Sequence, residues 1–330
     1  MDSDLTPGDP ASRLAVIALL QHGAFTRVQA LAAGWSAAAV DTRLRNGTWQ
    51  QLGRAVYAVT ATLPTPQPDR HRLDVAARLL ALAPDHVASH RSAALLHGWP
   101  VLGNPPPQPL LTRSPRARTD ASTSRFLRVA TLADVDVVEL DGLRVTSPAR
   151  TVVDVARHEH RRSATVVADA ALRAGLDGEQ LAKVAGRCRS WPGGAAGLQV
   201  VRFADGRADG PLESIARVAF AAGQLPAPEL QVEVRDLEGR LIGIVDFLWR
   251  AQRTVCEMDG LLKCDGDPLA LRREKQREDD LRRTGLEVVR GLWSEADRRP
   301  ALLCRRVEEA FELRARFRDR PVRYLLPPAA

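Results

Sequence analysis

Two acids interrupt apolar, strand-like runs late in this chain of 330 residues, and they carry its clearest chemistry. Asp246 stands in Ile-Val-Asp-Phe-Leu-Trp, and Glu257 stands in Thr-Val-Cys-Glu-Met-Asp. Because burying an unpaired carboxylate is costly, acids at such positions are typical of sites where a cation or hydrogen bonds compensate the charge. Carboxylate oxygens are the ligands that Mg²⁺ and Mn²⁺ prefer. The two acids therefore predict a divalent-metal site at one edge of a sheet.

The surrounding sequence predicts the elements that would hold these acids. Residues 230–235 and 241–249 are rich in β-branched side chains and flank a turn ending at Gly239, which indicates a hairpin. A third strand over 253–257 then carries Glu257. Glu213 follows Pro211 in the first turn of a predicted helix, where it can either cap that helix or join the acids as a third ligand.

The remaining C-terminal pattern completes a mixed sheet covered by helices. After the third strand we expect a helix over 268–284, a strand over 286–290 and a helix over 294–318. The resulting order is αβββαβα, which fits an α/β sandwich.

Residues 208–318 resemble the PD-(D/E)XK nuclease superfamily, in the family DUF559, which is similar to very-short-patch-repair endonucleases. The resemblance rests on Pro-Leu-Glu213-Ser, Val-Asp246-Phe-Leu-Trp, Glu257-Met-Asp259-Gly and Gly-Leu-Glu-Val-Val-Arg290. It implies a restriction-endonuclease-like domain in which Glu213, Asp246 and Glu257 hold Mg²⁺ or Mn²⁺ and phosphodiester bonds are cut. Such a metal polarises the scissile phosphate and lowers the pKa of a bound water, while a nearby cation offsets developing charge.

The sequence departs from this family where the family has a lysine, because Asp259 occupies that position. Lys263, Lys275 or Arg277 could supply the missing cation from farther along the chain. Asp259 itself is either a ligand or water-positioning residue, or part of a strand-ending turn without chemistry. Lys275, Arg277 and Arg282 are also expected near DNA phosphates, although the same helix fits an ordinary solvated face.

The first 63 residues predict a winged helix-turn-helix domain. Thr26 and Ser36 stand where N-caps of two successive helices are expected, and Gly34 lies in the turn between them. Residues 36–46 would be the recognition helix, and 49–59 would be a two-stranded wing. A plain three-helix packing unit is the alternative. The residues expected to contact DNA are Arg27, Ser36, Arg43, Arg45 and Arg54.

This N-terminal pattern also resembles a known family. The strings Gly-Ala-Phe-Thr26-Arg27-Val-Gln-Ala-Leu-Ala-Ala-Gly34 and Arg43-Leu-Arg45-Asn-Gly-Thr-Trp49 are similar to the winged helix of AbiEi-type antitoxins. The resemblance implies a DNA-binding regulator, with a toxin protein as a further partner.

A proline-rich segment over 64–68 marks a domain boundary, because each proline favours extended geometry. We predict a mixed α/β connecting domain over 64–207 and the nuclease-like domain over 208–330. The expected helices and strands of the connecting domain lie at 70–82, 89–97, 109–112, 125–129 and 135–140, with a helix starting at Pro148. Ser89-His90-Arg-Ser-Ala-Ala and Thr146-Ser-Pro-Ala-Arg150-Thr-Val-Val-Asp154 also resemble the middle part of the antitoxin-like family, but the residues themselves indicate no role.

Composition narrows the classes of function. A net charge of +7 and an isoelectric point of about 9.9 favour a polyanionic partner. The four cysteines form no C-x-x-C pair, and there is neither a G-x-S-x-G serine nor a glycine-rich phosphate loop, so zinc-thiolate, acyl-transfer and ATPase functions lack support. With no long apolar run and no signal-peptide pattern, we expect a cytoplasmic protein.

These observations leave three hypotheses. The leading one is a DNA-binding, Mg²⁺-dependent endonuclease of repair or defence type. The alternative is a non-catalytic, antitoxin-like transcriptional regulator with a degenerate nuclease fold. An RNA-directed toxin would use the same acids.

Overall fold

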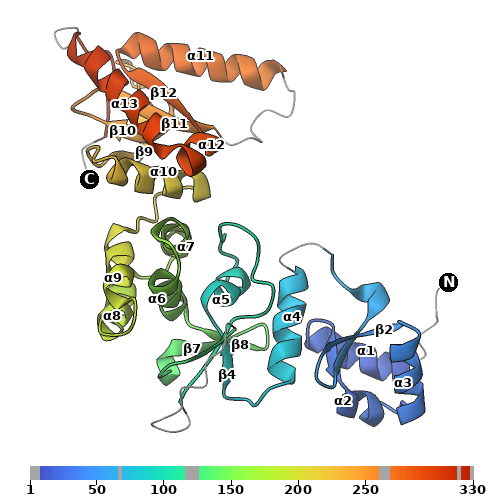
Figure 1. Cartoon of the computed structure of the whole chain (residues 1–330). Helices are drawn as coiled ribbons and strands as arrows, with labels where there is room; N and C mark the ends of the chain where they lie inside the picture. Colours follow the sequence, from blue (N-terminus) through green and yellow to red (C-terminus); the bar gives the residue numbers. More distant parts are fainter. Residues whose placement is uncertain (1–7, 66–68, 116–125, 260–267, 318–320, 328–330) are drawn as a thin grey trace. The chain divides into compact units, whose positions relative to one another are not determined.

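The computed structural model describes residues 8–65, 69–115, 126–259, 268–317 and 321–327 (Figure 1). It is a mixed α/β structure with several sheets and helices. The chain divides into two compact units, Met1–His158 with Glu179–Leu198, and Glu159–Gly178 with Gln199–Ala330. The division at residues 63 and 207 expected from the sequence stays a prediction. Among the described helices, none combines the length and apolar character needed to cross a membrane.

The first unit begins with three short helices and a three-stranded antiparallel sheet of order β1-β3-β2. Thr26 Oγ1 accepts the backbone N–H of Gln29 at 3.2 Å, and Ser36 Oγ accepts that of Ala39 at 3.2 Å, so each of two successive helices begins at an N-cap. Phe25 lies in the buried core between the helices and the sheet. The elements are α1 (Pro10–Leu20), β1 (Ala24–Thr26), α2 (Arg27–Ala32), α3 (Ala37–Arg45), β2 (Trp49–Gly53), β3 (Val56–Val59) and the 3₁₀ turn η1 (Thr60–Thr62).

The same unit continues with a five-stranded mixed sheet of order β6-β5-β4-β8-β7. The elements are α4 (Asp69–Leu80), β4 (His86–Ala88), α5 (His90–Leu96), β5 (Leu111–Arg113), β6 (Leu127–Val129), the turn η2 (Asp134–Asp136), β7 (Val137–Leu140), β8 (Leu143–Thr146), α6 (Pro148–His158) and α8 (Gly178–Arg187). Helix α9 (Gly194–Phe203) begins in this unit and continues into the second unit after Leu198. The sequence did not predict β4 and β8, although they pair with each other inside the sheet. Their three or four residues are too few to show an alternation.

The second unit holds a four-stranded sheet of order β12-β11-β10-β9, in which only the β11–β12 pair is parallel. Its elements are α7 (Arg161–Arg173), α10 (Pro211–Ala222), β9 (Glu229–Arg235), β10 (Leu241–Trp249), β11 (Thr254–Asp259), α11 (Pro268–Thr284), β12 (Glu287–Leu292), α12 (Trp293–Arg298) and α13 (Pro300–Ala315). The single last helix expected over 294–318 is wrong. Arg299 leaves helical geometry before Pro300, which has no N–H with which to continue a helix, and α13 starts anew at that proline.

Helix α7 is fastened to the C-terminal part of the second unit by a buried ion pair. Arg217 Nη1 of α10 donates to Asp169 Oδ2 of α7 at 2.6 Å, and the backbone N–H of Asp205 donates to Asp169 Oδ1 at 2.8 Å. Asp169 is fully buried, and burial raises the pKa of its carboxyl. A carboxylate buried this deeply needs both hydrogen-bond donors. The ion pair between Asp169 and Arg217 therefore keeps α7 packed against α10 within the second unit.

Candidate nucleic-acid interface and acid cluster

Helix α3 presents a face of small and polar side chains to solvent. Ala37, Ala38, Asp41, Thr42 and Arg45 are exposed, and their spacing places them on one side of the helix. Arg45 Nη2 donates to Thr42 Oγ1 at 3.2 Å. Small side chains at the start of a helix allow its backbone to approach the base edges of a groove, and an arginine farther along can read a base or hold a phosphate.

The arginines expected at this interface fall into two groups. Arg27 Nη1 donates to Asp41 Oδ1 at 2.7 Å, which ties α2 to α3, and the Arg43 guanidinium lies over the Trp35 ring, 3.7 Å from its centroid. Both side chains are therefore engaged in contacts within this segment. Arg45 and Arg54 are exposed, so they are the better placed of the four for contact with a polyanion. Ser36 is also exposed and caps α3.

The three acids singled out in the sequence lie on α10, β10 and β11. The strand register sets Asp246 of β10 between Gln231 of β9 and Glu257 of β11. Gln231 Nε2 donates to Glu213 Oε2 at 3.0 Å and to Asp246 Oδ1 at 3.4 Å. Asp246 Oδ2 also accepts the backbone N–H of Met258 at 2.7 Å. One amide side chain thus joins two of the acids, and the strand register brings the third beside them.

Gln231 was missed by the sequence reasoning, although it connects two predicted residues. Its backbone has a φ of +52° within β9, a left-handed conformation that a non-glycine residue adopts at a cost of about 1–3 kcal/mol. The only signal in the sequence is an amide in an alternating run of apolar residues. From this backbone conformation the Gln231 amide reaches both Glu213 and Asp246.

Two arginines form ion pairs with Glu257. Arg277 Nη1 of α11 donates to Glu257 Oε1 at 2.7 Å, and Arg277 Nη2 donates to Glu257 Oε2. Arg290 Nη1 of β12 lies 3.6 Å from Glu257 Oε2 and donates to Asp259 Oδ1 at 2.9 Å. Glu257 is only 5% exposed, so its charge is compensated by protein cations rather than by water. Arg290 was not predicted either, because its role follows from the parallel pairing of β11 and β12.

A glycine gives Arg277 room to reach this position. A Cβ atom at Gly243 of β10 would lie 3.1 Å from Arg277 Cδ and 3.2 Å from Nη1, tighter than ordinary contact. The other basic residues predicted for this cluster are elsewhere: Lys275 is exposed, and Arg282 Nη1 donates to Glu287 Oε1 at 2.7 Å. Lys263 lies outside the described residues.

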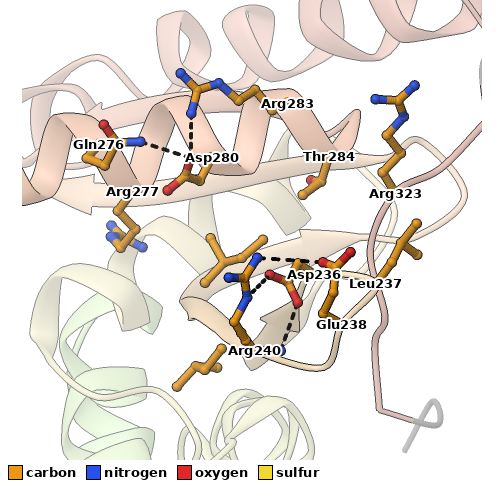
Figure 2. A pocket seen from close by; sticks show the side chains of 12 residues that line it. Asp236, Leu237, Glu238, Arg240, Gln276, Arg277, Asp280, Arg283, Thr284 and Arg323 are labelled. Atoms are coloured by element: carbon orange, nitrogen blue, oxygen red, sulfur yellow. Dashed lines mark hydrogen bonds and ion pairs between the residues drawn. The ribbon is translucent and has the colours of Figure 1, made fainter.

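A hollow of about 920 Å³ separates the β9–β10 turn from α11 (Figure 2). Its charges largely neutralise one another: Arg240 Nε donates to Asp236 Oδ2 at 2.7 Å, and Arg283 Nη1 donates to Asp280 Oδ1 at 2.8 Å. Arg277 also lines this hollow, on the side that carries Gln276 and Asp280. Because the ion pairs satisfy most of the arginines, this surface offers little net attraction for a polyanion.

Burial governs the protonation of the acid cluster. It raises the pKa of Glu213 to about 7, and the negative charge of Asp246 acts in the same direction, against the hydrogen bonds from the Asp209 N–H and Gln231. Burial also raises the pKa of Glu257, while Arg277 and Arg290 lower it. Glu213 is therefore partly protonated near neutral pH.

These contacts decide how well the acids fit a divalent ion. Within the described ranges, no three acidic, histidine or cysteine side chains lie together in a way that could hold a metal. Both oxygens of Glu257 are held by Arg277, and Asp246 and Glu213 already accept hydrogen bonds from the protein. This arrangement does not fit Mg²⁺ or Mn²⁺. The metal site of Glu213, Asp246 and Glu257 stays a prediction.

The chain is similar to two curated proteins and to one solved structure. Two curated relatives, the uncharacterized proteins MT2308 and Rv2248 of Mycobacterium tuberculosis, are each 31% identical over 169 residues. These alignments cover 51% of this chain and 62% of each relative, which is less than two thirds of their length. The crystal structure of the RV2827C protein from Mycobacterium tuberculosis matches with a TM-score of 0.38 and 16% identity, over 63% of this chain and 80% of that chain.

The family comparison covers the segment that contains α2, α3 and the two strands after them. Residues 12–60 match the family described as a transcriptional regulator, AbiEi antitoxin. This match confirms the antitoxin-like resemblance of the N-terminal residues. The DUF559 resemblance of the C-terminal residues stays a prediction. Residues 12–60 are therefore similar to the regulator domain of AbiEi antitoxins.

Proposed function

We propose that this protein is a DNA-binding transcriptional regulator of the antitoxin type, in which residues 1–63 form a winged helix and α3 reads DNA. The observation that carries the proposal is the exposed face of α3, which ends in Arg45 and lies in the segment that matches the antitoxin regulators. The net charge of +7 supports a polyanionic partner. In this role the chain would have a toxin protein as its second partner.

The first prediction concerns the two exposed arginines of this segment. Arg45→Ala and Arg54→Ala should each weaken binding to duplex DNA from upstream of the gene by about 1–3 kcal/mol if the side chain contacts a base, and should lower the salt dependence by about one ion if it contacts a phosphate. Fluorescence anisotropy at several salt concentrations measures both the affinity and its salt dependence. A duplex of shuffled sequence shows how much of the affinity depends on the DNA sequence.

Arg78→Ala is the matched control, because Arg78 is an exposed arginine on α4 and its loss changes the net charge equally. Binding in the control should equal that of the wild type. If Arg45→Ala and Arg54→Ala bind as tightly as Arg78→Ala at every salt concentration, α3 and the following turn are not the DNA-reading surface.

For the C-terminal residues we propose a nuclease-like fold that no longer hydrolyses nucleic acid. Its support is the bidentate contact of Arg277 with Glu257 together with Asp259 at the family's lysine position. Arg277 contacts both carboxylate oxygens of Glu257, which a metal ion would need as ligands. Its positive charge therefore balances the carboxylate without a metal ion. A metal-dependent endonuclease is the second candidate, because Glu213, Asp246 and Glu257 lie on neighbouring elements.

The second prediction separates these two candidates. Supercoiled plasmid incubated with the wild-type chain and Mg²⁺ or Mn²⁺ should remain intact, and Asp246→Ala should give the same result. Gel electrophoresis of the plasmid is the measurement, with a structured RNA as a parallel substrate. Metal-dependent nicking that disappears in Asp246→Ala would establish the nuclease and remove the degenerate-fold proposal, whereas cleavage of the RNA alone would identify an RNA-directed enzyme.

A further inference from the structure

An acidic side chain, Asp41, lies on the exposed face of α3. Ala37 and Ala38 stand one turn before it on this face, and Arg45 stands one turn after it. The Asp41 side chain is 53% exposed. Because both preceding neighbours are alanines, the carboxylate is not hidden behind a longer side chain on that side. It is therefore accessible to any groove that α3 enters.

Arg27 of α2 holds one oxygen of this carboxylate. Arg27 Nη1 donates to Asp41 Oδ1 at 2.7 Å. Among the residues that the structure describes, Asp41 Oδ2 accepts no hydrogen bond. The hydrogen bond from Arg27 lowers the pKa of Asp41, so the carboxyl is ionised at neutral pH and acts only as an acceptor. Asp41 therefore offers one oriented oxygen to a donor outside the protein.

The hydroxyl of Thr42, next to Asp41 on this face, is engaged within the helix. Thr42 Oγ1 donates to the Ala38 carbonyl at 2.8 Å and accepts from Arg45 Nη2 at 3.2 Å. The second contact keeps the Arg45 guanidinium beside the same face. The face thus combines an anionic acceptor at Asp41 with a cationic donor at Arg45, one helical turn apart.

A carboxylate at this position opposes binding to DNA of arbitrary sequence. The phosphates repel its charge, and entry into a groove removes water from its oxygens. In the major groove, cytosine presents an N4 amino donor, whereas guanine presents two acceptors and thymine an acceptor and a methyl group. Adenine sets its N6 donor beside the N7 acceptor, which also repels a carboxylate. The cost is therefore best offset where a cytosine faces Asp41.

We propose that Asp41 is a specificity-determining residue of α3, and that its Oδ2 accepts a hydrogen bond from the N4 amino group of a cytosine in the major groove. This role rests on the proposed function, because α3 must read duplex DNA for Asp41 to meet a base. Arg27 is then a positioning residue that orients the carboxylate through Oδ1. The charge of Asp41 weakens binding to sites without that cytosine, so specificity comes largely from rejection of other sequences.

The experiment selects binding sites for the full chain from random duplexes, and then measures variants by fluorescence anisotropy on the selected duplex and on a shuffled one. Asp41→Ala should weaken binding to the selected duplex by about tenfold, because the contact with cytosine is lost. It should tighten binding to the shuffled duplex at low salt, because the repelled charge is gone. Asp41→Asn, which keeps the size of the side chain, should also lose the preference for cytosine.

A modified base tests the contact itself. In the selected duplex, the cytosine whose preference depends on Asp41 is replaced by 2-pyrimidinone, which lacks the 4-amino group. The wild-type chain should bind this duplex about tenfold more weakly than the cytosine duplex. Asp41→Ala should bind both duplexes equally, and it controls for the weaker base pair.

Far-UV circular dichroism verifies that each variant is folded, and the outcomes separate this role from the proposed function. If the wild-type chain binds no duplex or selects no sequence, both are overturned. If it selects a sequence and Arg45→Ala weakens that binding, but Asp41→Ala weakens both duplexes alike or neither, only the role of Asp41 is overturned. A base other than cytosine at the position that depends on Asp41 overturns that role as well.

Discussion

Arg150→Ala is expected to destabilise the first unit by about 3–5 kcal/mol, because it removes one partner of a buried ionic network. Arg150 is 1% exposed and lies between two carboxylates, with Nε 2.9 Å from Asp154 Oδ2 and Nη1 3.2 Å from Asp136 Oδ2. Nη1 also donates to the Thr131 carbonyl at 2.9 Å. Without the guanidinium, two almost fully buried aspartates face one another with less compensation. Urea unfolding of the variant, followed by circular dichroism, measures the loss.

The chain provides a close control on another helix. Arg70 and Asp74 of α4 form an ion pair with the same spacing of four residues, at 3.3 Å, but about a third of each side chain is exposed. Arg70→Ala should therefore cost less than about 1 kcal/mol. Equal losses for Arg150→Ala and Arg70→Ala would show that burial of the Arg150 network does not matter, which would contradict its assigned role.

The second large effect is an opposite response of the two units to acid. In the first unit, burial lowers the pKa of His71, His90 and His97, that of His90 to about 4. The unfolded chain therefore binds protons that the folded unit rejects, and stability that is present above about pH 6.5 is lost as the pH falls toward 4. At about pH 5, His90 alone should cost about 2 kcal/mol relative to neutral pH.

In the second unit, Glu213 makes acidification stabilising instead of destabilising. Its folded pKa of about 7 lies above the ordinary glutamate value of 4.5, so the folded unit holds a proton that the unfolded chain has released. The stability contributed by this bound proton is fully present when the pH is below the ordinary glutamate pKa. It is lost as the pH rises through about 7. Acidification from about pH 7.5 to about pH 5 should thus stabilise the second unit by about 2 kcal/mol.

Hydrogen exchange measured by mass spectrometry, corrected for the intrinsic exchange rate, follows the two units separately through the amides of α5 and α10. Protection of α5 should fall with acid and that of α10 should rise. Glu213→Gln should reduce the second response and leave the first unchanged. Responses of the same sign in both units, or an unchanged response in Glu213→Gln, would refute the assignment.

The local features of this fold were predictable because they depend on neighbours in the sequence. Thr26 and Ser36 cap α2 and α3 as expected, because a hydroxyl beside the first turn needs only the following N–H groups. The turn at Gly239 was predictable in the same way, because glycine adopts a left-handed backbone without strain. The structure gives this residue a φ of +81°. Such signals require no knowledge of strand order.

The contacts that define the candidate sites were less predictable because they depend on tertiary register. Nothing near Arg43 in the sequence indicates that its guanidinium stacks on Trp35 instead of facing solvent. The link from Gln231 to Glu213 and Asp246 requires the pairing of β9 with β10, and the contact of Arg290 with Asp259 requires the parallel pairing of β11 with β12. Residue type located the acids and made Arg277 one of three candidate cations, but the fold was needed to identify Gln231 and Arg290 as their partners.

The way the chain alternates between the two units limits how its gene can recombine. Residues 159–178 belong with the C-terminal unit, while 179–198 return to the other unit, so the polypeptide crosses from one to the other three times. A recombination event that exchanged only the tail beyond residue 207 would leave Asp169 with a foreign residue in place of Arg217, and an unmatched interior anion is costly. The two halves of this gene are therefore expected to descend together rather than to be shuffled as separate modules.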